Sequence, residues 1–246
     1  MNSDHPLVRL SDIDEERFGI RTARTDDVTA EALPSVLSFC RHRAVVLLIA
    51  RCPASDLRAA QSMEREGFLL MDTLVHYGRD LLNVPIPAES PVIPVRAALP
   101  DEEGEVVEVA AQAFRSYLGH YHADDRLDRG QCDEVYTSWA LRSCLSRDVA
   151  DEVLVASLSD SITGFLTLRM ATPDEGHGIL FAVAPSVRGR GVSSALMIGG
   201  MRWCLEKGAS RMVIPTQVNN MPSQKVWCRL GFEPSHAQYT FHKWFD

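Results

Sequence analysis

The spacing of hydrophobic and polar residues predicts the same order of elements at both ends of the chain: a strand, a helix, a Gly-Phe pair and another strand. Near the N-terminus, a strand over 45–49 precedes a helix that Gly67 ends. Near the C-terminus, a strand over 211–214 precedes a helix over 222–230 that Gly231 ends. The closing strands are expected over 68–77 and 238–245. We interpret the two stretches, offset by 231 − 67 = 164 residues, as a degenerate internal duplication.

The middle of the chain alternates between the helical period and the strand period. Strands are expected over 95–98, 153–158, 162–169 and 178–183, and helices over 101–114, 132–145 and 191–207. This order predicts an α/β (α+β) fold with a mixed, mostly antiparallel sheet flanked by helices.

Proline divides the chain, because five of its 13 prolines lie between residues 81 and 101. Proline lacks the backbone donor that strands and helix interiors use. We therefore expect a smaller α/β domain over 1–84, a linker over 85–94 and a larger domain over 95–246.

Composition and charge narrow the class of protein. The chain has 246 residues and a net charge of −8, from 25 Lys and Arg against 33 Asp and Glu, which argues against nucleic acid as a partner. Its longest aliphatic run, 44–50, is far below the roughly 18 residues of a membrane span. The acidic N-terminus lacks the apolar core of an export signal, and the six cysteines form no CxxC pair. We expect a cytoplasmic protein, with a homodimer left open.

One glycine-interrupted turn carries the strongest chemical signal. A strand ending at Val183 runs through Arg188-Gly189-Arg190-Gly191 into the helix that Val192 and Ser193 begin. Glycines let a ligand approach the backbone, and the helix N-terminus offers N–H groups and a positive dipole. The turn therefore suits a phosphate or pyrophosphate, although a plain tight turn with exposed arginines explains the same residues.

This turn and a second motif resemble the GNAT superfamily of N-acetyltransferases. Residues 188–193 fit its R/Q-x-x-G-x-G/A signature except at Ser193, and 220–232 fit the signature in which an Asn opens a helix that ends in Gly-Phe. The resemblance covers about 95–246. It implies a GNAT fold and acetyl-CoA as co-substrate, bound by Phe181, Ala182, Val183, Arg188, Gly189, Arg190, Gly191, Val192, Ser193 and Asn220.

Looser motifs are similar to dTDP-fucosamine and related sugar-nucleotide amine acetyltransferases, in which a half-GNAT domain precedes the catalytic one. These motifs are Arg17-Phe18-Gly19-Ile20, Tyr121-His122, Tyr136, Trp139 and Tyr239-Thr240-Phe241. The resemblance implies acetyl transfer to the primary amine of a small molecule, with a nucleotide-linked amino sugar favoured. Another amine, such as an antibiotic or an amino acid, and a non-catalytic acyl-CoA-binding module stay open.

The catalytic groups follow from direct attack of a neutral amine on a thioester. Many GNAT relatives carry a Tyr, which protonates the leaving thiolate, where this chain has Trp227. An indole N–H can donate a hydrogen bond to sulfur but does not release its proton near pH 7. Cys228, Ser223 and Tyr239 are alternative acids.

Histidine suits the general base, because its ordinary pKa lies near neutral pH. His122 and His177 are the candidates. The substrate would contact Tyr121, His122, Tyr136 and Trp139, although core packing explains these aromatic residues equally well. We expect no metal, since His120, His122 and Cys132 lack a fourth ligand at a suitable spacing.

Overall fold

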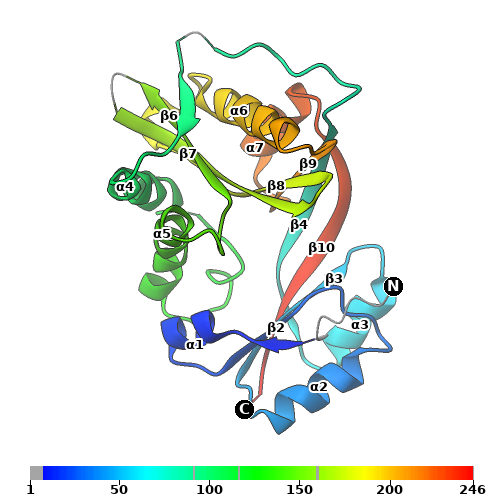
Figure 1. The fold of residues 1–246 in the computed structure, drawn as a ribbon. Coiled ribbons are helices and arrows are strands. Elements are labelled where there is room, and N and C mark those ends of the chain that lie inside the picture. The colour runs from blue at the N-terminus through cyan, green and yellow to red at the C-terminus, as the bar shows by residue number, and fades with distance from the viewer. Residues whose placement is uncertain (1–7, 91, 116, 159–160, 246) are drawn as a thin grey trace. The chain divides into compact units, whose positions relative to one another are not determined.

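A computed structural model describes residues 8–90, 92–115, 117–158 and 161–245 (Figure 1). The chain forms two compact units that are not continuous in sequence. The first unit comprises Met1–Val75, Leu118–Gln131 and His236–Asp246, and the second comprises His76–Tyr117 and Cys132–Ser235.

The first unit combines short strands and helices on one sheet. Its elements are β1 (Arg9–Leu10), α1 (Asp12–Phe18), β2 (Thr22–Thr25), α2 (Leu33–His42), β3 (Leu47–Pro53), α3 (Leu57–Arg65), the start of β4 (Leu69–Asp80) and the end of β10 (Glu233–Trp244). The strand order is β1-β2-β3-β10-β4. β2 and β3 are parallel, whereas β10 pairs with β3 in the antiparallel sense. The core of this unit is a cluster of buried aliphatic side chains, closed on one side by Phe68 and Phe241.

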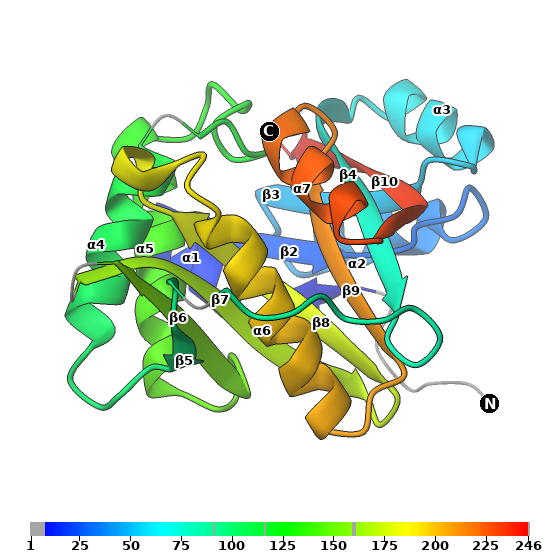
Figure 2. The same cartoon turned by 90° about the horizontal axis from the view of Figure 1, so that it is seen from above.

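The second unit is a larger sheet with helices on both faces. Its elements are β5 (Val95–Ala97), α4 (Glu103–Phe114), α5 (Arg129–Leu145, whose first residues lie in the first unit), β6 (Glu152–Leu158), β7 (Ser161–Thr172), β8 (Glu175–Val183), the 3₁₀ turn η1 (Pro185–Val187), α6 (Val192–Glu206), β9 (Arg211–Gln217) and α7 (Met221–Arg229). The strand order is β4-β9-β8-β7-β6-β5. Seen from above, α6 lies across β7 and β8, and α4 packs on β7 and β8 as well (Figure 2).

The fold class is confirmed: the sheet is mixed and mostly antiparallel, and helices flank it. The elements from β3 onward match the expected ones within about five residues, whereas β1, α1, β2 and α2 were not predicted. α1 has only seven residues, although Ser11 and the acidic residues of its first turn are typical of a helix start. α2 begins at Ala32 without a side-chain cap and has no acidic residue in its first turn. β2 has four residues, two of them threonines that are fully or almost fully buried.

The two ends of the chain match in detail. Asp56 caps α3 by accepting a hydrogen bond from the Ala59 N–H at 3.0 Å, and Asn220 caps α7 from Ser223 at 3.4 Å. Gly67 and Gly231 follow these helices with φ of 77° and 81°, a conformation that favours glycine. These features fit an internal duplication.

The last strand of each stretch is shared between the units. β4 begins in the first unit and ends in the second, and β10 does the reverse. In the first unit, β10 lies between β3 and β4, and in the second, β4 is the neighbour of β9. The expected division into a domain over 1–84, a linker over 85–94 and a domain over 95–246 follows the sequence, whereas the two compact units exchange strands. The division therefore stays a prediction.

Candidate functional site

A fork opens between β8 and β9, which form a parallel strand pair in the second unit. The two strands pair at Glu175–Arg211, Gly176–Met212 and His177–Val213. β8 continues to Val183 and β9 to Gln217, so residues 178–183 and 214–217 form two diverging prongs. We call residues 178–183 of β8 the upper prong and residues 214–217 of β9 the lower prong. We call this region the fork.

A bulge in β8 lies at the mouth of the fork. On the other side of β8, Thr167 pairs with Leu180 but Leu168 pairs with Gly178, which leaves Ile179 as an extra residue. A bulge bends its strand and interrupts the ladder locally. Because the described pairing of β8 with β9 ends at His177, the backbone groups of residues 178–183 that face β9 are available to a ligand that enters between the prongs.

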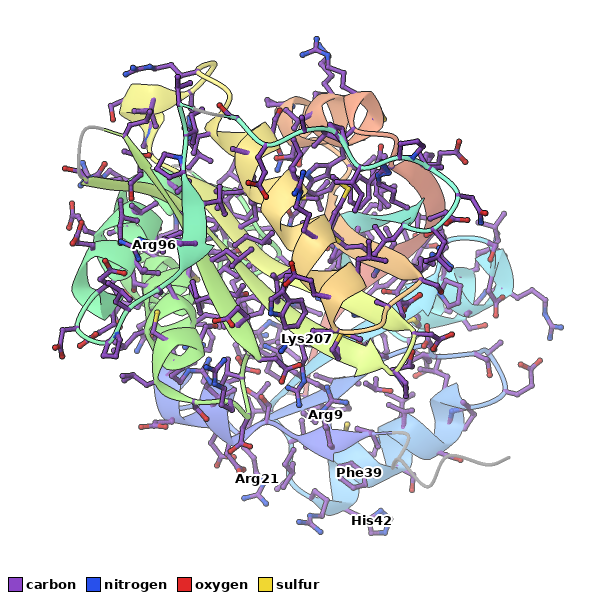
Figure 3. The ribbon with its side chains drawn as sticks, turned by 45° about the horizontal axis from the view of Figure 1, so that its top comes forward. Arg9, Arg21, Phe39, His42, Arg96 and Lys207 are labelled. Atoms are coloured by element: carbon purple, nitrogen blue, oxygen red, sulfur yellow. The ribbon has the colours of Figure 1, made fainter. Side chains whose placement is uncertain are left out.

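The glycine turn follows the upper prong and starts α6. Gly189 and Gly191 have φ of 79° and 90°, and residues 188–191 are exposed. A Cβ on Gly189 would meet nothing within 4 Å. No side chain among the described residues caps α6, whose first-turn N–H groups lack helical partners. Lys207 marks the opposite end of this 15-residue helix (Figure 3). The N-terminal end is therefore an open anion site.

The lower prong leads into α7 through Asn220. The Asn220 Oδ1 accepts from the Ser223 N–H, and its Nδ2 donates to the Thr216 Oγ1 at 2.9 Å. The side chain thus ties the end of β9 to the start of α7. Its expected contact with a cofactor stays a prediction.

Trp227 of α7 is a buried donor without an acceptor. The side chain is 2% exposed, and the indole Nε1 has no hydrogen-bond partner among the described residues. Its ring contacts Tyr77 of β4 edge-on, with 5.5 Å between the centroids. A buried donor without a partner destabilises the folded protein, and an acceptor on a ligand would remove this penalty.

Tyr77 is the residue of this site that sequence reasoning missed. It is 5% exposed, and its hydroxyl donates to the Gln224 Oε1 of α7 at 2.9 Å. No motif includes Tyr77, because it reaches α7 from a strand about 150 residues earlier in the chain.

His177 stands where the fork opens. Its Nε2 lies 2.7 Å from the Glu175 Oε1, and the side chain is half-buried. A Cβ on Gly176 or Gly178 would collide with Cys204 or Ile214, so those positions face the packed layer under α6 and α7. Side chains alternate along a strand, so His177 points to the opposite face.

Three other expected site residues lie in the first unit. Tyr121 is 4% exposed, its hydroxyl donates to the Asp14 Oδ1 at 2.8 Å and also contacts Arg24, and burial raises the pKa of Tyr121 to about 12. His122 is buried, and its carbonyl accepts from the Arg129 Nη1 at 2.8 Å. Tyr239 is half-buried on β10. Their expected roles stay predictions.

The remaining aromatic candidates lie on α5 in the second unit. The buried Tyr136 stacks on Phe114 with 4.2 Å between centroids and an interplanar angle of 12°. Trp139 is half-buried one turn later. The described contacts of Tyr136 are those of a packed core residue.

The comparison with protein families covers this site. Residues 112–232 match the model of the acetyltransferase (GNAT) family. We call residues 112–232 the GNAT segment. This GNAT segment contains the fork, the glycine turn and α7. Members of the family use acetyl-CoA as co-substrate and act on amines.

One similar protein aligns with most of this chain. The spore coat polysaccharide biosynthesis protein SpsD of Bacillus subtilis (strain 168) is 21% identical over 202 residues, which cover 80% of this chain and 66% of SpsD. The chain thus spans just under two thirds of that relative's length.

Solved structures show the fold. A GCN5-related N-acetyltransferase from Sphaerobacter thermophilus superposes with a TM-score of 0.65 at 15% identity, covering 96% of this chain and 76% of that one. A tandem GNAT protein from the clavulanic acid biosynthesis pathway superposes with a TM-score of 0.63 at 17% identity, covering 92% of this chain and 76% of that one.

None of the helices in the described part of the chain is long and apolar enough to cross a bilayer.

Proposed function

We propose that this protein is an acyl-CoA-dependent N-acyltransferase that transfers an acetyl group from acetyl-CoA to the primary amine of a small molecule. The observation that carries the proposal is the fork beside an uncapped helix N-terminus, with two left-handed glycines in the turn between them. Both features lie inside the GNAT segment.

The residues of the turn suit coenzyme A. The turn of residues 188–193 would bind its pyrophosphate, since glycine exposes the backbone and the dipole of α6 favours an anion. The N–H groups of Arg188 and Arg190 already donate to the Pro185 and Val187 carbonyls, so the other N–H groups of the turn would make the contact. Phe181, Ala182 and Val183 on the upper prong would pair with the pantetheine arm. Asn220 would contact the arm from the lower prong.

The chemistry is one acyl transfer. The amine nitrogen attacks the thioester carbonyl, the C–N bond forms, the C–S bond breaks, and the amine loses a proton while the thiolate gains one. Positioning of the two reactants supplies much of the rate. His177, held by Glu175 at the mouth of the fork, is our first candidate for the base, and His122 of the first unit is the second. The Trp227 N–H would donate a hydrogen bond to the sulfur without transferring its proton.

A nucleotide-linked amino sugar is the favoured acceptor. Its support is the set of motifs similar to sugar-nucleotide amine acetyltransferases, together with a relative named for polysaccharide biosynthesis. An antibiotic or amino acid amine is the alternative within the same reaction class.

Two measurements test the proposal. Calorimetry with coenzyme A should show micromolar or tighter binding, and release of free thiol from acetyl-CoA should depend on an added amine. The panel should contain nucleotide-linked amino sugars, aminoglycosides and amino acids, with the matching hydroxy compounds as controls. Binding without thiol release for any amine would contradict the enzyme and favour an acyl-CoA-binding module.

A further inference from the structure

The indole of Trp227 cannot supply the proton that the departing sulfur needs. We infer that Tyr77 of β4 supplies it, so that the catalytic hydroxyl reaches the fork from a strand instead of from α7. This inference rests on the proposed N-acyl transfer. It concerns a residue outside both sequence signatures.

The position of Tyr77 along the sheet follows from the strand pairing. The Leu81 N–H donates to the Ser210 carbonyl at 2.8 Å, so the end of β4 lies beside the start of β9. Neighbouring strands that meet in this way are antiparallel. In a regular antiparallel ladder this bond places Tyr77, four residues before Leu81, opposite Ile214, four residues after Ser210. Ile214 directly follows Val213, the last residue of β9 that pairs with β8. Tyr77 thus lies beside the part of β9 where the pairing with β8 ends and the fork begins.

The side chain of Tyr77 lies under α7. Its ring contacts Trp227 edge-on, and its hydroxyl donates to the Gln224 Oε1. Cys228, one turn after Gln224, lies beside the same hydroxyl. The phenol therefore occupies the side of α7 that carries Trp227, the position from which a tyrosine acts in many GNAT relatives.

The environment keeps the phenol protonated. Burial raises the pKa of Tyr77 above its ordinary value near 10, and the nearby Cys228 acts in the same direction. The neutral Gln224 amide oxygen accepts the hydrogen bond but does not take the proton. A donor that rests on a neutral acceptor can turn toward a sulfur on which negative charge develops.

The step balances as follows. As the C–S bond breaks, the electron pair goes to sulfur, and the Tyr77 O–H proton passes to the thiolate to give the free thiol. The phenolate then takes up the proton that the attacking amine released, delivered through solvent. No oxidant or further reactant is needed.

Tyr77→Phe tests the inference, because it removes the hydroxyl and keeps the ring that packs on Trp227. We expect kcat to fall about 10- to 100-fold, toward the lower end of what general acids contribute, with KM for acetyl-CoA within threefold. The matched control is Ser235→Ala, which removes a hydroxyl that donates to the His76 carbonyl at 3.0 Å, next to Tyr77. It should keep the wild-type kcat. Unfolding curves of both variants should match that of the wild type.

Trp227→Tyr supplies a second readout that a packing role would not move. In the Tyr77→Phe background it places a hydroxyl on α7 and should restore kcat to within about fivefold of the wild type. A folded Tyr77→Phe variant with unchanged kcat overturns the inference and leaves the proposed function intact. So does a folded double variant without rescue. A wild type that releases no thiol with any amine overturns the proposed function and the inference together.

Discussion

The buried network around Asp14 in the first unit contrasts with the buried indole of Trp227 in the second. In the first unit, the carboxylate of Asp14 accepts hydrogen bonds from the Ser11 Oγ at 2.6 Å, the Arg24 Nε at 2.5 Å and the Tyr121 hydroxyl. In the second unit, the Trp227 Nε1 is buried without an acceptor among the described residues. The N-terminus of α6 lacks a side-chain cap there as well.

A second network in the first unit shows the same saturation. The Nδ1 of His242 lies 2.6 Å from the Asp124 Oδ2, and its Nε2 lies 2.9 Å from the His120 Nδ1. The Trp244 indole also donates to Asp124, at 3.0 Å. Buried polar groups that satisfy one another rigidify a unit, whereas donors left without partners are available to a ligand. The contrast indicates that these two networks stabilise the fold of the first unit, whereas the Trp227 N–H stays available to a ligand.

The largest expected effect comes from removing the centre of the first network. Asp14 is fully buried, and its pKa lies below the ordinary value: burial alone would raise it, but the hydrogen bond and charge of Arg24 outweigh that. Asp14→Ala leaves Arg24 without its counter-charge, and we expect it to lower the free energy of unfolding by about 3 kcal/mol or more.

Urea denaturation measures this change. Asp26→Ala is the control, because Asp26 forms a more exposed pair with Arg9 at 3.5 Å and should cost less than about 1 kcal/mol. Equal losses for the two variants would contradict the role of the network.

The second prediction concerns the open helix N-terminus. Gly191→Glu places bulk and negative charge where the pyrophosphate would bind, and we expect the affinity for coenzyme A to fall at least about 100-fold, which corresponds to about 2.7 kcal/mol. Part of the cost is conformational, because Gly191 has φ of 90°.

Gly208→Glu separates the two causes. Gly208 has φ of 94° and follows Lys207 at the other end of α6, so it carries the same strain and charge away from the turn (Figure 3). It should bind coenzyme A like the wild type. Micromolar binding by Gly191→Glu in calorimetry would refute the placement of the pyrophosphate.

The smallest effect is the acid sensitivity of the second network. Burial, followed by the nearby His242, holds the pKa of His120 well below its ordinary value of 6.5. The folded protein therefore binds fewer protons at His120 than the unfolded chain does, so this contribution is complete above about pH 6.5 and is lost as the pH falls. At pH 5.5 we expect a loss of about 1 kcal/mol.

Unfolding by urea at pH 7.5 and 5.5 measures this loss, and His120→Gln should reduce the difference between the two pH values. His42→Gln is the control, since His42 is exposed on α2 (Figure 3), and it should keep the wild-type difference. If His120→Gln keeps that difference too, His120 is not the group that titrates.

Local signals explain what could be predicted. The Asp56 cap, the left-handed Gly67 and the Gly189–Gly191 turn each depend on residues within one or two turns of the chain, so short patterns reveal them. The general area of the site followed from the same signals. The bulge at Ile179 did not, because a bulge depends on the register against β7 and leaves no mark in β8 alone.

The sequence by itself determined the order of strands and helices from β3 onward, the turn that suits a diphosphate and the absence of a tyrosine at position 227. Only the tertiary structure decided that β4 and β10 each have residues in both units, that Asp14 accepts a hydrogen bond from Tyr121, and that Tyr77 contacts α7. The reason is physical. Caps and turns are fixed by contacts between neighbours in the chain, whereas these pairings join residues about 100 or more positions apart and form only when the whole sheet is assembled.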